Sequence, residues 1–276
     1  MKIVIAGLGI IGGSYAKAIK KYTDHRVIGI NRSEKPLLLA LQCGAIDTIG
    51  TAKDLETADM LILGMYPQAS VEFIEKYGKY INKQCIVCDT SGIKSEICPE
   101  MVELSQRFGF TFVGTHPMAG KETNGFVSAD EDLFKNASCI IVPCGAPKQA
   151  INLVTNFVFS IGFTQAPVTT PQEHDRMIAF TSQVPHVLAC AYVLSPQCKK
   201  HNGFSAGSYR DVSRVAKINA ELWTELFLEN KKPLVDELDE LIGNLTELRN
   251  SIEQADDKKL SIQLKEARKI KEELGE

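Results

Sequence analysis

The stretch that decides the fold is Lys2-Ile3-Val4-Ile5-Ala6-Gly7-Leu8-Gly9-Ile10-Ile11-Gly12-Gly13-Ser14, at the start of the chain. An apolar strand pattern leads directly into Gly-x-Gly-x-x-Gly, and a helical pattern follows. Gly7 permits the tight turn, Gly9 leaves the backbone open to a pyrophosphate, and Gly12 lets the helix pack close to the strand. Free N–H groups at the helix N-terminus favour phosphates. The sequence predicts a dinucleotide site at Gly7, Gly9, Ile10, Ile11 and Gly12, with a glycine-rich turn of another α/β fold as the alternative.

The end of the second expected strand, residues 26–30, carries the residues that distinguish NAD from NADP. An acidic residue about 20 positions after the glycines binds the ribose 2′-hydroxyl of NAD. Asn31 stands there instead, followed by Arg32 and Ser33. Asn31 does not repel a phosphate, and Arg32 can pair with one. The pattern favours NADP, or the use of both cofactors. The alternative is that Arg32 stacks on the adenine or faces solvent.

The composition is that of an ordinary globular chain. Of 276 residues, 44% are hydrophobic and 24% are charged, which suits one large domain or two smaller ones. The net charge of −3 gives no electrostatic case for binding nucleic acid or an anionic membrane. Met1-Lys2 runs directly into a core strand, so we expect no signal peptide. No apolar run approaches the roughly 18 residues of a membrane helix. These features predict a cytoplasmic protein.

Cysteines and histidines give no metal pattern. Cys85-x-x-Cys88 resembles half of a zinc or redox site, but it lies inside an expected strand and no second pair follows. Buried free thiols in a reducing cytoplasm are the favoured interpretation of the eight cysteines. None of the five histidines has a convincing metal-ligand spacing, so the sequence predicts no metal.

Up to about residue 168, short apolar strands alternate with helical stretches. We expect strands at residues 2–6, 26–30, 60–64, 86–89, 110–113, 139–143 and 163–168. This alternation predicts a mostly parallel sheet covered on both faces, with ligands at the carboxyl ends of its strands. Residues 1–168 are therefore expected to form a Rossmann-type α/β dinucleotide-binding domain.

Strand patterns end at Pro171, and the rest of the chain is helical in pattern. We expect helices over 172–196 and 208–230. Apolar residues then recur at spacings of four and three, as in a heptad seam: Leu234, Leu238, Leu241, Leu245, Leu248 and Ile252. Such a seam is often core within one chain. A small all-α domain at 169–276 would bury more surface against a second copy, so we favour a homodimer through it.

Two expected strand-end loops carry candidate catalytic residues. His116 lies in Gly114-Thr115-His116-Pro117, where a nicotinamide would reach, and histidine is suited to take a hydroxyl proton near neutral pH. The alternative is a loop histidine with a structural role. In the loop Asp89-Thr90-Ser91-Gly92-Ile93-Lys94, Ser91 or Thr90 suits a bond to a substrate hydroxyl or the cofactor. Lys94 suits an anion, or faces solvent.

The helical half holds further candidates. Glu173-His174-Asp175-Arg176 begins a helix, and Gln183-Val184-Pro185-His186 lies further along it, with a kink expected at the proline. Such a helix suggests the wall of a cleft. Asp211 and Arg214 are one helical turn apart, which indicates either a surface ion pair or an arginine that grips a carboxylate and is oriented by Asp211.

Together with Gly207–Arg214 and Glu221-Leu222-Trp223, these motifs resemble, in order and over nearly the whole chain, the prephenate dehydrogenase family, which includes arogenate dehydrogenases. The resemblance implies oxidative decarboxylation of prephenate to 4-hydroxyphenylpyruvate with NAD or NADP, in tyrosine biosynthesis. Its alternative substrate is arogenate, which would give tyrosine directly. The resemblance also implies that His116 accepts the proton of the ring hydroxyl, that Arg214 binds a substrate carboxylate, and that His174 and His186 line the cleft.

Two positions depart from the family pattern. Many members carry a serine where this chain has Gly92, so Ser91 is the candidate that would replace it. Some members carry a histidine where this chain has Gln183, which we retain with Asp211 among the expected substrate-binding residues. Two other functions stay open: a β-hydroxyacid or imine dehydrogenase using Lys217, and a cofactor-binding regulatory protein without activity.

Overall fold

The computed structural model describes residues 1–121 and 123–275, which form two compact units. The first comprises Met1–Ile178 with Lys217–Glu229, and the second comprises Ala179–Ala216 with Asn230–Glu276. The first unit therefore takes in two helices beyond residue 168, α6 (Pro171–Ile178) and α9 (Ala220–Glu229). The physical reason is packing, because α6 contacts the sheet and Leu226 of α9 lies beside the loop at Gly92.

The described residues of the first unit form a seven-stranded sheet. Its strands are β1 (Lys2–Ala6), β2 (Arg26–Ile30), β3 (Thr48–Ile49), β4 (Met60–Leu63), β5 (Ile86–Asp89), β6 (Thr111–Pro117) and β7 (Cys139–Val142). They lie in the order β3-β2-β1-β4-β5-β6-β7, and only β7 is antiparallel to its neighbour. The predicted mostly parallel α/β sheet is confirmed.

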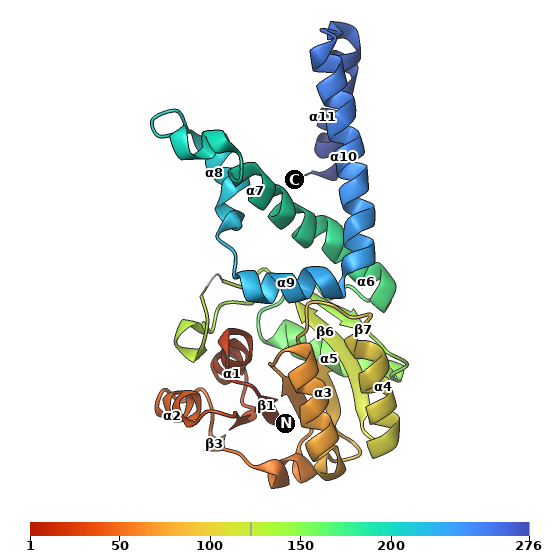
Figure 1. Cartoon of the computed structure of the whole chain (residues 1–276). Helices are drawn as coiled ribbons and strands as arrows, with labels where there is room; N and C mark the ends of the chain where they lie inside the picture. Colours follow the sequence, from red (N-terminus) through yellow and green to blue (C-terminus); the bar gives the residue numbers. More distant parts are fainter. Residues whose placement is uncertain (122, 276) are drawn as a thin grey trace. The chain divides into compact units, whose positions relative to one another are not determined.

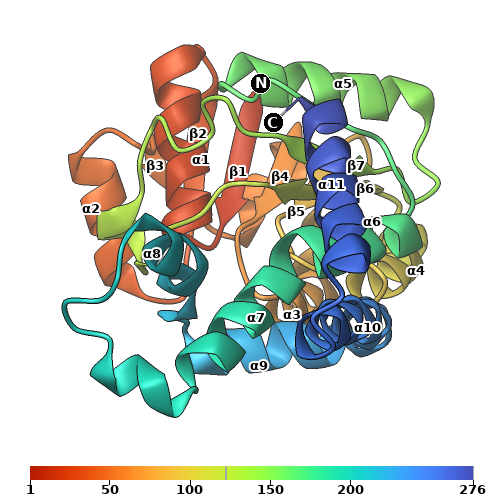
Figure 2. The same cartoon turned by 90° about the horizontal axis from the view of Figure 1, so that it is seen from above.

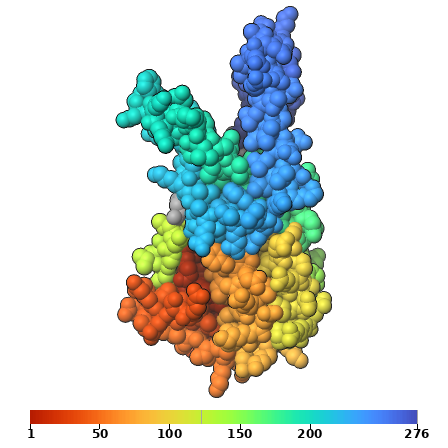
Figure 3. Space-filling model, in the orientation of Figure 1, coloured from red at the N-terminus to blue at the C-terminus, as the bar shows by residue number. Residues whose placement is uncertain are grey.

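Helices cover both faces of this sheet (Figures 1 and 2). One face packs against α1 (Ile10–Tyr22), α2 (Glu34–Gln42) and α5 (Lys148–Ser160), and the other against α3 (Pro67–Tyr77) and α4 (Ile97–Phe108). In the space-filling view α3 and α4 form one continuous orange-to-yellow surface (Figure 3). Alternate side chains of a strand point to opposite faces, so Ile3 and Ile5 join the first core and Val4 and Ala6 the second. A strand buried on both sides is therefore apolar throughout.

The strand order reverses between β1 and β4, and this reversal positions the ligand site. From β1 the chain moves outward through β2 and β3, and it returns to β4 on the other side of β1. At the carboxyl ends of the two strands, Gly64 donates its N–H to Ala6 O at 2.8 Å. A Cβ at Gly64 would lie 2.7 Å from Gly7 O. Ligands of open α/β sheets bind at such a switch point.

The strand predicted over residues 163–168 is not formed. Gln165 and Val168 make isolated bridges to Ser138 and Ile141. Pro167 has no N–H to donate to a ladder, although its carbonyl accepts the N–H of Ile141 at 2.8 Å. The edge strand β3 was not expected. Short 3₁₀ turns complete this unit: η1 (Ala52–Thr57), η2 (Gly78–Tyr80) and η3 (Phe126–Ser128).

The second unit is helical. Its elements are the π-helical turn η4 (Ala179–Gln183), α7 (Val184–Val193), η5 (Pro196–Lys200), α8 (Gly207–Ser213), η6 (Arg214–Ala216), α10 (Lys231–Glu253) and α11 (Asp257–Leu274). The π turn ends at Gln183, two residues before Pro185, which has no N–H to donate to the backbone bond of a regular helix. In the described part of the chain, no helix has the length and apolar character needed to cross a membrane.

Helices α10 and α11 pack as a hairpin, side by side in Figure 1. Asp256 caps α11 by accepting the N–H of Lys259 at 2.9 Å, and Lys259 pairs with Glu247 at 2.6 Å. This packing buries only part of the heptad seam. Leu234 is 5% exposed, whereas Leu245 is 49% and Ile252 is 63% exposed. Much of the apolar surface of the hairpin is therefore left uncovered within one chain.

Candidate active site

The glycine loop has the geometry of a phosphate-binding turn. Gly7 has φ +94°, and its N–H binds Ile30 O at 2.8 Å. A Cβ at Gly12 would lie 1.9 Å from Gly7 O, so only glycine allows this approach of helix to strand. A Cβ at Gly9 would meet no atom within 4 Å. Helix α1, which begins at Ile10, has no side-chain cap. Free N–H groups and open space together fit a dinucleotide pyrophosphate.

Asn31 links this loop to the end of β2. Its Oδ1 accepts the N–H of Leu8 at 3.0 Å, and its Nδ2 donates to Ser33 O at 2.9 Å. The side chains of Arg32 and Ser33 are exposed. Asn31 therefore shapes the loop, and Arg32 is the cation that is accessible to a phosphate at this position.

The two glycines make a matched pair for experiment. We expect Gly12→Ala to lower the melting temperature, because the new methyl group would overlap the Gly7 carbonyl. We expect Gly9→Ala to keep the melting temperature but lose at least tenfold in nucleotide affinity, because the methyl group would enter open space where the pyrophosphate binds. Thermal unfolding and isothermal titration with NAD⁺ and NADP⁺ measure both effects. Full nucleotide affinity in Gly9→Ala would contradict this site.

His116 lies near the carboxyl end of β6 and is the first of three linked side chains. Its Nδ1 is 2.9 Å from Nε2 of His174 on α6. The Nδ1 of His174 is 2.7 Å from Oδ1 of Asp175. His174 and Asp175 are each 1% exposed, whereas His116 is partly exposed. Both ring nitrogens of His174, predicted to contact substrate, thus have protein partners.

A buried ion pair holds the backbone beside His116. The side chains of Asp89 and Lys94 are fully buried and bonded to each other. Lys94 Nζ also donates to Thr115 O at 2.6 Å, and Thr115 N–H donates to Asp89 Oδ1 at 3.0 Å. Lys94 was predicted to hold an anion or face solvent. The expectation of a solvent-facing side chain is wrong, because Lys94 is fully buried, and the anion that it holds is the carboxylate of Asp89.

The electrostatic environment keeps His116 neutral. Burial lowers the pKa of His116 well below its usual 6.5, and the charge of the nearby Lys94 lowers it further. At pH 7 the ring is therefore unprotonated at one nitrogen and able to accept a proton.

The carboxyl of Asp175 is held in its charged form. Burial acts to raise its pKa, but hydrogen bonds from His174 and from Lys94 and Ser95 bring the pKa below its usual value. Glu229, at the end of α9, behaves in the opposite way. Burial, helped by the charges of Glu225, Glu96 and Asp175, raises the pKa of Glu229 to about 7. Near neutral pH, negative charge beside Asp175 is thus reduced by partial protonation of Glu229.

The loop after β5 faces the base. A Cβ at Gly92 would lie 3.5 Å from Leu226 Cδ2, 3.9 Å from His116 Nε2 and 4.0 Å from His116 Cε1, so the Nε2–Cε1 edge of the His116 ring lies beside this glycine. Ser91 is 4% exposed, and its N–H donates to Asp89 Oδ2 at 2.9 Å. Within the described residues the Ser91 hydroxyl has no hydrogen-bond partner. It is therefore available to a ligand hydroxyl.

The remaining predicted substrate-binding residues lie in the second unit. His186 on α7 has its Nδ1 2.7 Å from Ser182 O. Gln183 is 1% exposed, and its Oε1 accepts from Asn230 Nδ2 at 2.7 Å. Gln183 was expected to face substrate, but this oxygen is engaged in a buried amide pair.

The predicted ion pair between Asp211 and Arg214 is not formed in the described part of the chain, where both side chains are exposed. Helix α8 ends at Ser213, and the 3₁₀ turn η6 begins at Arg214, so the two side chains do not share one continuous α-helical face. Arg214 is thus an exposed cation that can bind an anion.

The structure also brings in residues that the sequence analysis left out of the site, namely Asp175, Asp89 and Thr115. Each lies next to a candidate that was named. An acidic residue directly after His174, and a carboxylate five positions before Lys94, were the available signs. They were missed because neither spacing by itself says that the groups meet.

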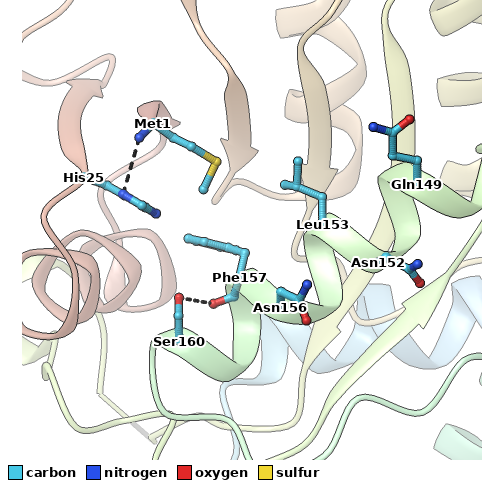
Figure 4. A pocket seen from close by; sticks show the side chains of 8 residues that line it. All are labelled: Met1, His25, Gln149, Asn152, Leu153, Asn156, Phe157 and Ser160. Atoms are coloured by element: carbon cyan, nitrogen blue, oxygen red, sulfur yellow. Dashed lines mark hydrogen bonds between the residues drawn. The ribbon is translucent and has the colours of Figure 1, made fainter.

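A surface hollow of about 440 Å³ lies elsewhere (Figure 4). It is lined by Met1, His25, Gln149, Asn152, Leu153, Asn156, Phe157 and Ser160. Met1 and His25 precede β1 and β2, so the hollow lies at the amino edge of the sheet. Gly7 and His116 lie at the carboxyl edge, where parallel sheets bind ligands. The hollow is therefore not the candidate active site.

Comparisons with known proteins match both halves of the chain. The model of the prephenate dehydrogenase nucleotide-binding domain matches residues 15–164, and that of the dimerization domain matches residues 170–266. A prephenate dehydrogenase of Bacillus subtilis is 32% identical over 99% of this chain and 76% of its own length. Among solved structures, the prephenate dehydrogenase of A. aeolicus in complex with hydroxyphenyl propionate and NAD⁺ is 25% identical, with a TM-score of 0.87 over 99% of this chain and 98% of that one. The arogenate dehydrogenase of Synechocystis is also 25% identical, with a TM-score of 0.87 over 99% of this chain and 100% of that one.

Proposed function

This chain belongs to the prephenate dehydrogenase family, and from that premise we propose that it oxidatively decarboxylates prephenate to 4-hydroxyphenylpyruvate in tyrosine biosynthesis, with NAD⁺ or NADP⁺ as the oxidant. The observation that carries the proposal is a neutral histidine, His116, at the carboxyl edge of a dinucleotide-binding sheet. The Nε2–Cε1 edge of its ring lies beside Gly92, on the loop that carries the unpartnered Ser91 hydroxyl.

In the proposed reaction, Nε2 of His116 accepts the proton of the substrate's ring hydroxyl as that carbon loses a hydride. When bound, the oxidised nicotinamide supplies the acceptor for this hydride and its two electrons. The ring carbon becomes a carbonyl conjugated with the diene. The bond to the ring carboxylate then breaks, its electron pair completes the aromatic ring, and carbon dioxide leaves. The phenolic oxygen recovers the proton from His116, so the histidine is regenerated.

The other predicted residues take supporting roles in this proposal. Ser91 would bond the substrate hydroxyl beside His116, and the exposed Arg214 would bind a substrate carboxylate. His186 would bind the substrate from α7. Gln183 and Asp211 stay predicted substrate-binding residues, although the Oε1 of Gln183 accepts a buried hydrogen bond from Asn230.

His116→Asn tests the base directly. We expect kcat to fall at least 100-fold, because asparagine cannot take the proton, while nucleotide affinity stays unchanged. Arg214→Ala is the matched binding variant and should mainly raise the KM for prephenate. Formation of reduced nicotinamide, followed by absorbance, measures both. Unchanged kcat in His116→Asn would remove the histidine from the mechanism.

Arogenate is the alternative substrate, supported by the likeness to the Synechocystis arogenate dehydrogenase. The two substrates differ only in a side-chain keto group or ammonium group. The same assay with arogenate therefore decides between them. Turnover of arogenate alone would assign that activity, and silence with both substrates would favour a different dehydrogenase or a nucleotide-binding protein without activity.

We propose that NADP⁺ is accepted at least as well as NAD⁺. Asn31 stands at the position where an acidic residue would repel the 2′-phosphate, and the exposed Arg32 that follows can pair with this phosphate. Arg32→Gln should lower kcat/KM for NADP⁺ about tenfold relative to NAD⁺. Asn31→Asp should shift the ratio in the same direction, since Asp keeps an acceptor for Leu8 N–H and adds negative charge. Parallel kinetics with the two cofactors measure the ratio. An unchanged ratio in both variants would show that phosphate pairing is absent.

We propose a homodimer through α10 and α11, whose exposed apolar residues include Ile242, Leu245, Ile252, Ile262 and Leu264. Leu245→Glu should raise the dimer dissociation constant at least tenfold, because it would bury a charge in the interface. Thr246→Glu, an exposed neighbouring position, adds the same charge as a control. Sedimentation velocity across a concentration series measures dissociation. A monomeric parent protein would refute the proposal.

A further inference from the structure

We propose that His174 and Asp175 are positioning residues that fix the ring of His116 with its proton on Nδ1, so that Nε2 carries the lone pair that acts as the base. The inference rests on the proposed function for the role of His116 in catalysis. It concerns a different question, namely which nitrogen of that histidine is free and what keeps it so.

Asp175 can only accept hydrogen bonds. Its Oδ1 accepts the backbone N–H of Lys94 at 2.8 Å, and its Oδ2 accepts the backbone N–H of Ser95 at 2.7 Å. Hydrogen bonds from His174, Ser95 and Lys94 outweigh the effect of burial and hold the pKa of Asp175 below its usual value, so near neutral pH the carboxyl is ionised and can only accept. The contact between Asp175 Oδ1 and His174 Nδ1 at 2.7 Å must then be donated by the histidine.

The direction of the next bond follows from the first. A neutral imidazole carries one N–H and one lone pair. Because Nδ1 of His174 carries the proton, its Nε2 is an acceptor. The contact of 2.9 Å between this Nε2 and Nδ1 of His116 is therefore donated by His116. The lone pair of His116 is left on Nε2, which is the ring nitrogen beside Gly92.

One residue anchors both ends of this chain of side chains. The backbone N–H of Lys94 holds Asp175, and the Lys94 side chain holds the carbonyl of Thr115, the residue before His116. Lys94 and Asp175 are 81 positions apart in the sequence, and the whole arrangement lies within the first unit. With both ends fixed to the same residue, neither histidine ring can turn without breaking a buried hydrogen bond.

The arrangement also has a consequence during turnover. Once Nε2 of His116 holds the substrate proton, the ring is an imidazolium that donates from Nδ1 to His174. The carboxylate of Asp175 lies on the far side of His174 and stabilises the new positive charge on His116. Asp175 itself stays ionised and takes up no proton. A triad in which a carboxylate sets the tautomer of the catalytic imidazole works on the same physical principle.

The alternative is a doubly protonated His174, which would donate to both Asp175 and His116. In that case His116 would carry its proton on Nε2 and could not act as a base. The two states differ in where protons reside on His116, which makes them separable by spectroscopy without any turnover.

The first test is ¹⁵N NMR of the full-length protein labelled at histidine, at pH 8. Protonated and unprotonated ring nitrogens have distinct shifts, and couplings to ring C–H protons assign them to Nδ1 or Nε2. The chain has five histidines, so comparison with His116→Asn and His174→Phe identifies the two rings. We expect the His116 proton on Nδ1. A proton on Nε2 of His116, or on both nitrogens of His174, would overturn the inference.

The second test is kinetic and uses two substitutions of one residue. His174→Phe keeps a ring but removes both bonds, so kcat should fall about 100-fold while the KM for prephenate stays within about threefold. His174→Gln offers an amide oxygen that can accept from His116 Nδ1. Its kcat should therefore be at least tenfold higher than that of His174→Phe. His25→Gln, at the amino edge of the sheet (Figure 4), is the control and should match the parent protein. If His174 has only a structural role, His174→Phe and His174→Gln should both lower the melting temperature and should lose activity to the same extent.

Asp175→Asn is unsuitable as the main variant. Its amide nitrogen would face the backbone N–H of either Lys94 or Ser95, two donors that cannot bond to each other. A loss of activity could then come from local disruption as well as from a changed tautomer of His116. The outcomes also separate the two proposals. Full activity of His116→Asn would refute the proposed base, whatever its tautomer. Loss of activity in His116→Asn with full activity in His174→Phe would refute the positioning role alone.

Discussion

The buried ion pair between Asp89 and Lys94 is the constraint on which the catalytic edge depends. Both side chains are fully inaccessible, so their charges are tolerable only because each is matched and hydrogen-bonded. Removing one partner would leave the other charge unpaired in the core, at a cost of about 3–5 kcal/mol. The pair ties the loop after β5 to β6 beside His116, while the Lys94 backbone holds Asp175. The base, its neighbour His174 and the ion pair are thus one bonded assembly.

The two kinds of candidate site use opposite electrostatic environments. His116 must be neutral to act as a base, and burial with nearby positive charge lowers its pKa accordingly. Arg214, which is proposed to bind a substrate carboxylate, is exposed in the second unit. The glycine loop differs from both, since it offers uncharged backbone N–H groups and open space at Gly9 to a phosphate. The proposed proton transfer, anion binding and phosphate binding would therefore each depend on a different kind of chemical group.

Some expectations failed for identifiable physical reasons. The apolar run at 163–168 suggested a strand, but Pro167 cannot continue a ladder and only isolated bridges form. The spacing of Asp211 and Arg214 suggested a pair on one helix, but the helix changes to a 3₁₀ turn between them. Lys94 was expected to hold an anion or to face solvent, because nothing local to it shows that Asp89 and Thr115 enclose its ammonium group. Each failure concerns a partner that the local pattern does not specify.

The sequence by itself determined the parallel sheet, the glycine loop and the identity of the candidate base. These features depend on residues that are close together in the sequence. They are the strand periodicity, the need for glycine at Gly7 and Gly12, and the position of His116 at a strand end. Only the tertiary structure decided that His116 meets His174 across 58 positions, and that Asp175 rather than a ligand engages the second nitrogen of His174. Hydrogen bonds between distant residues depend on how the helices and the sheet pack, and packing sums many weak contacts that no single segment encodes.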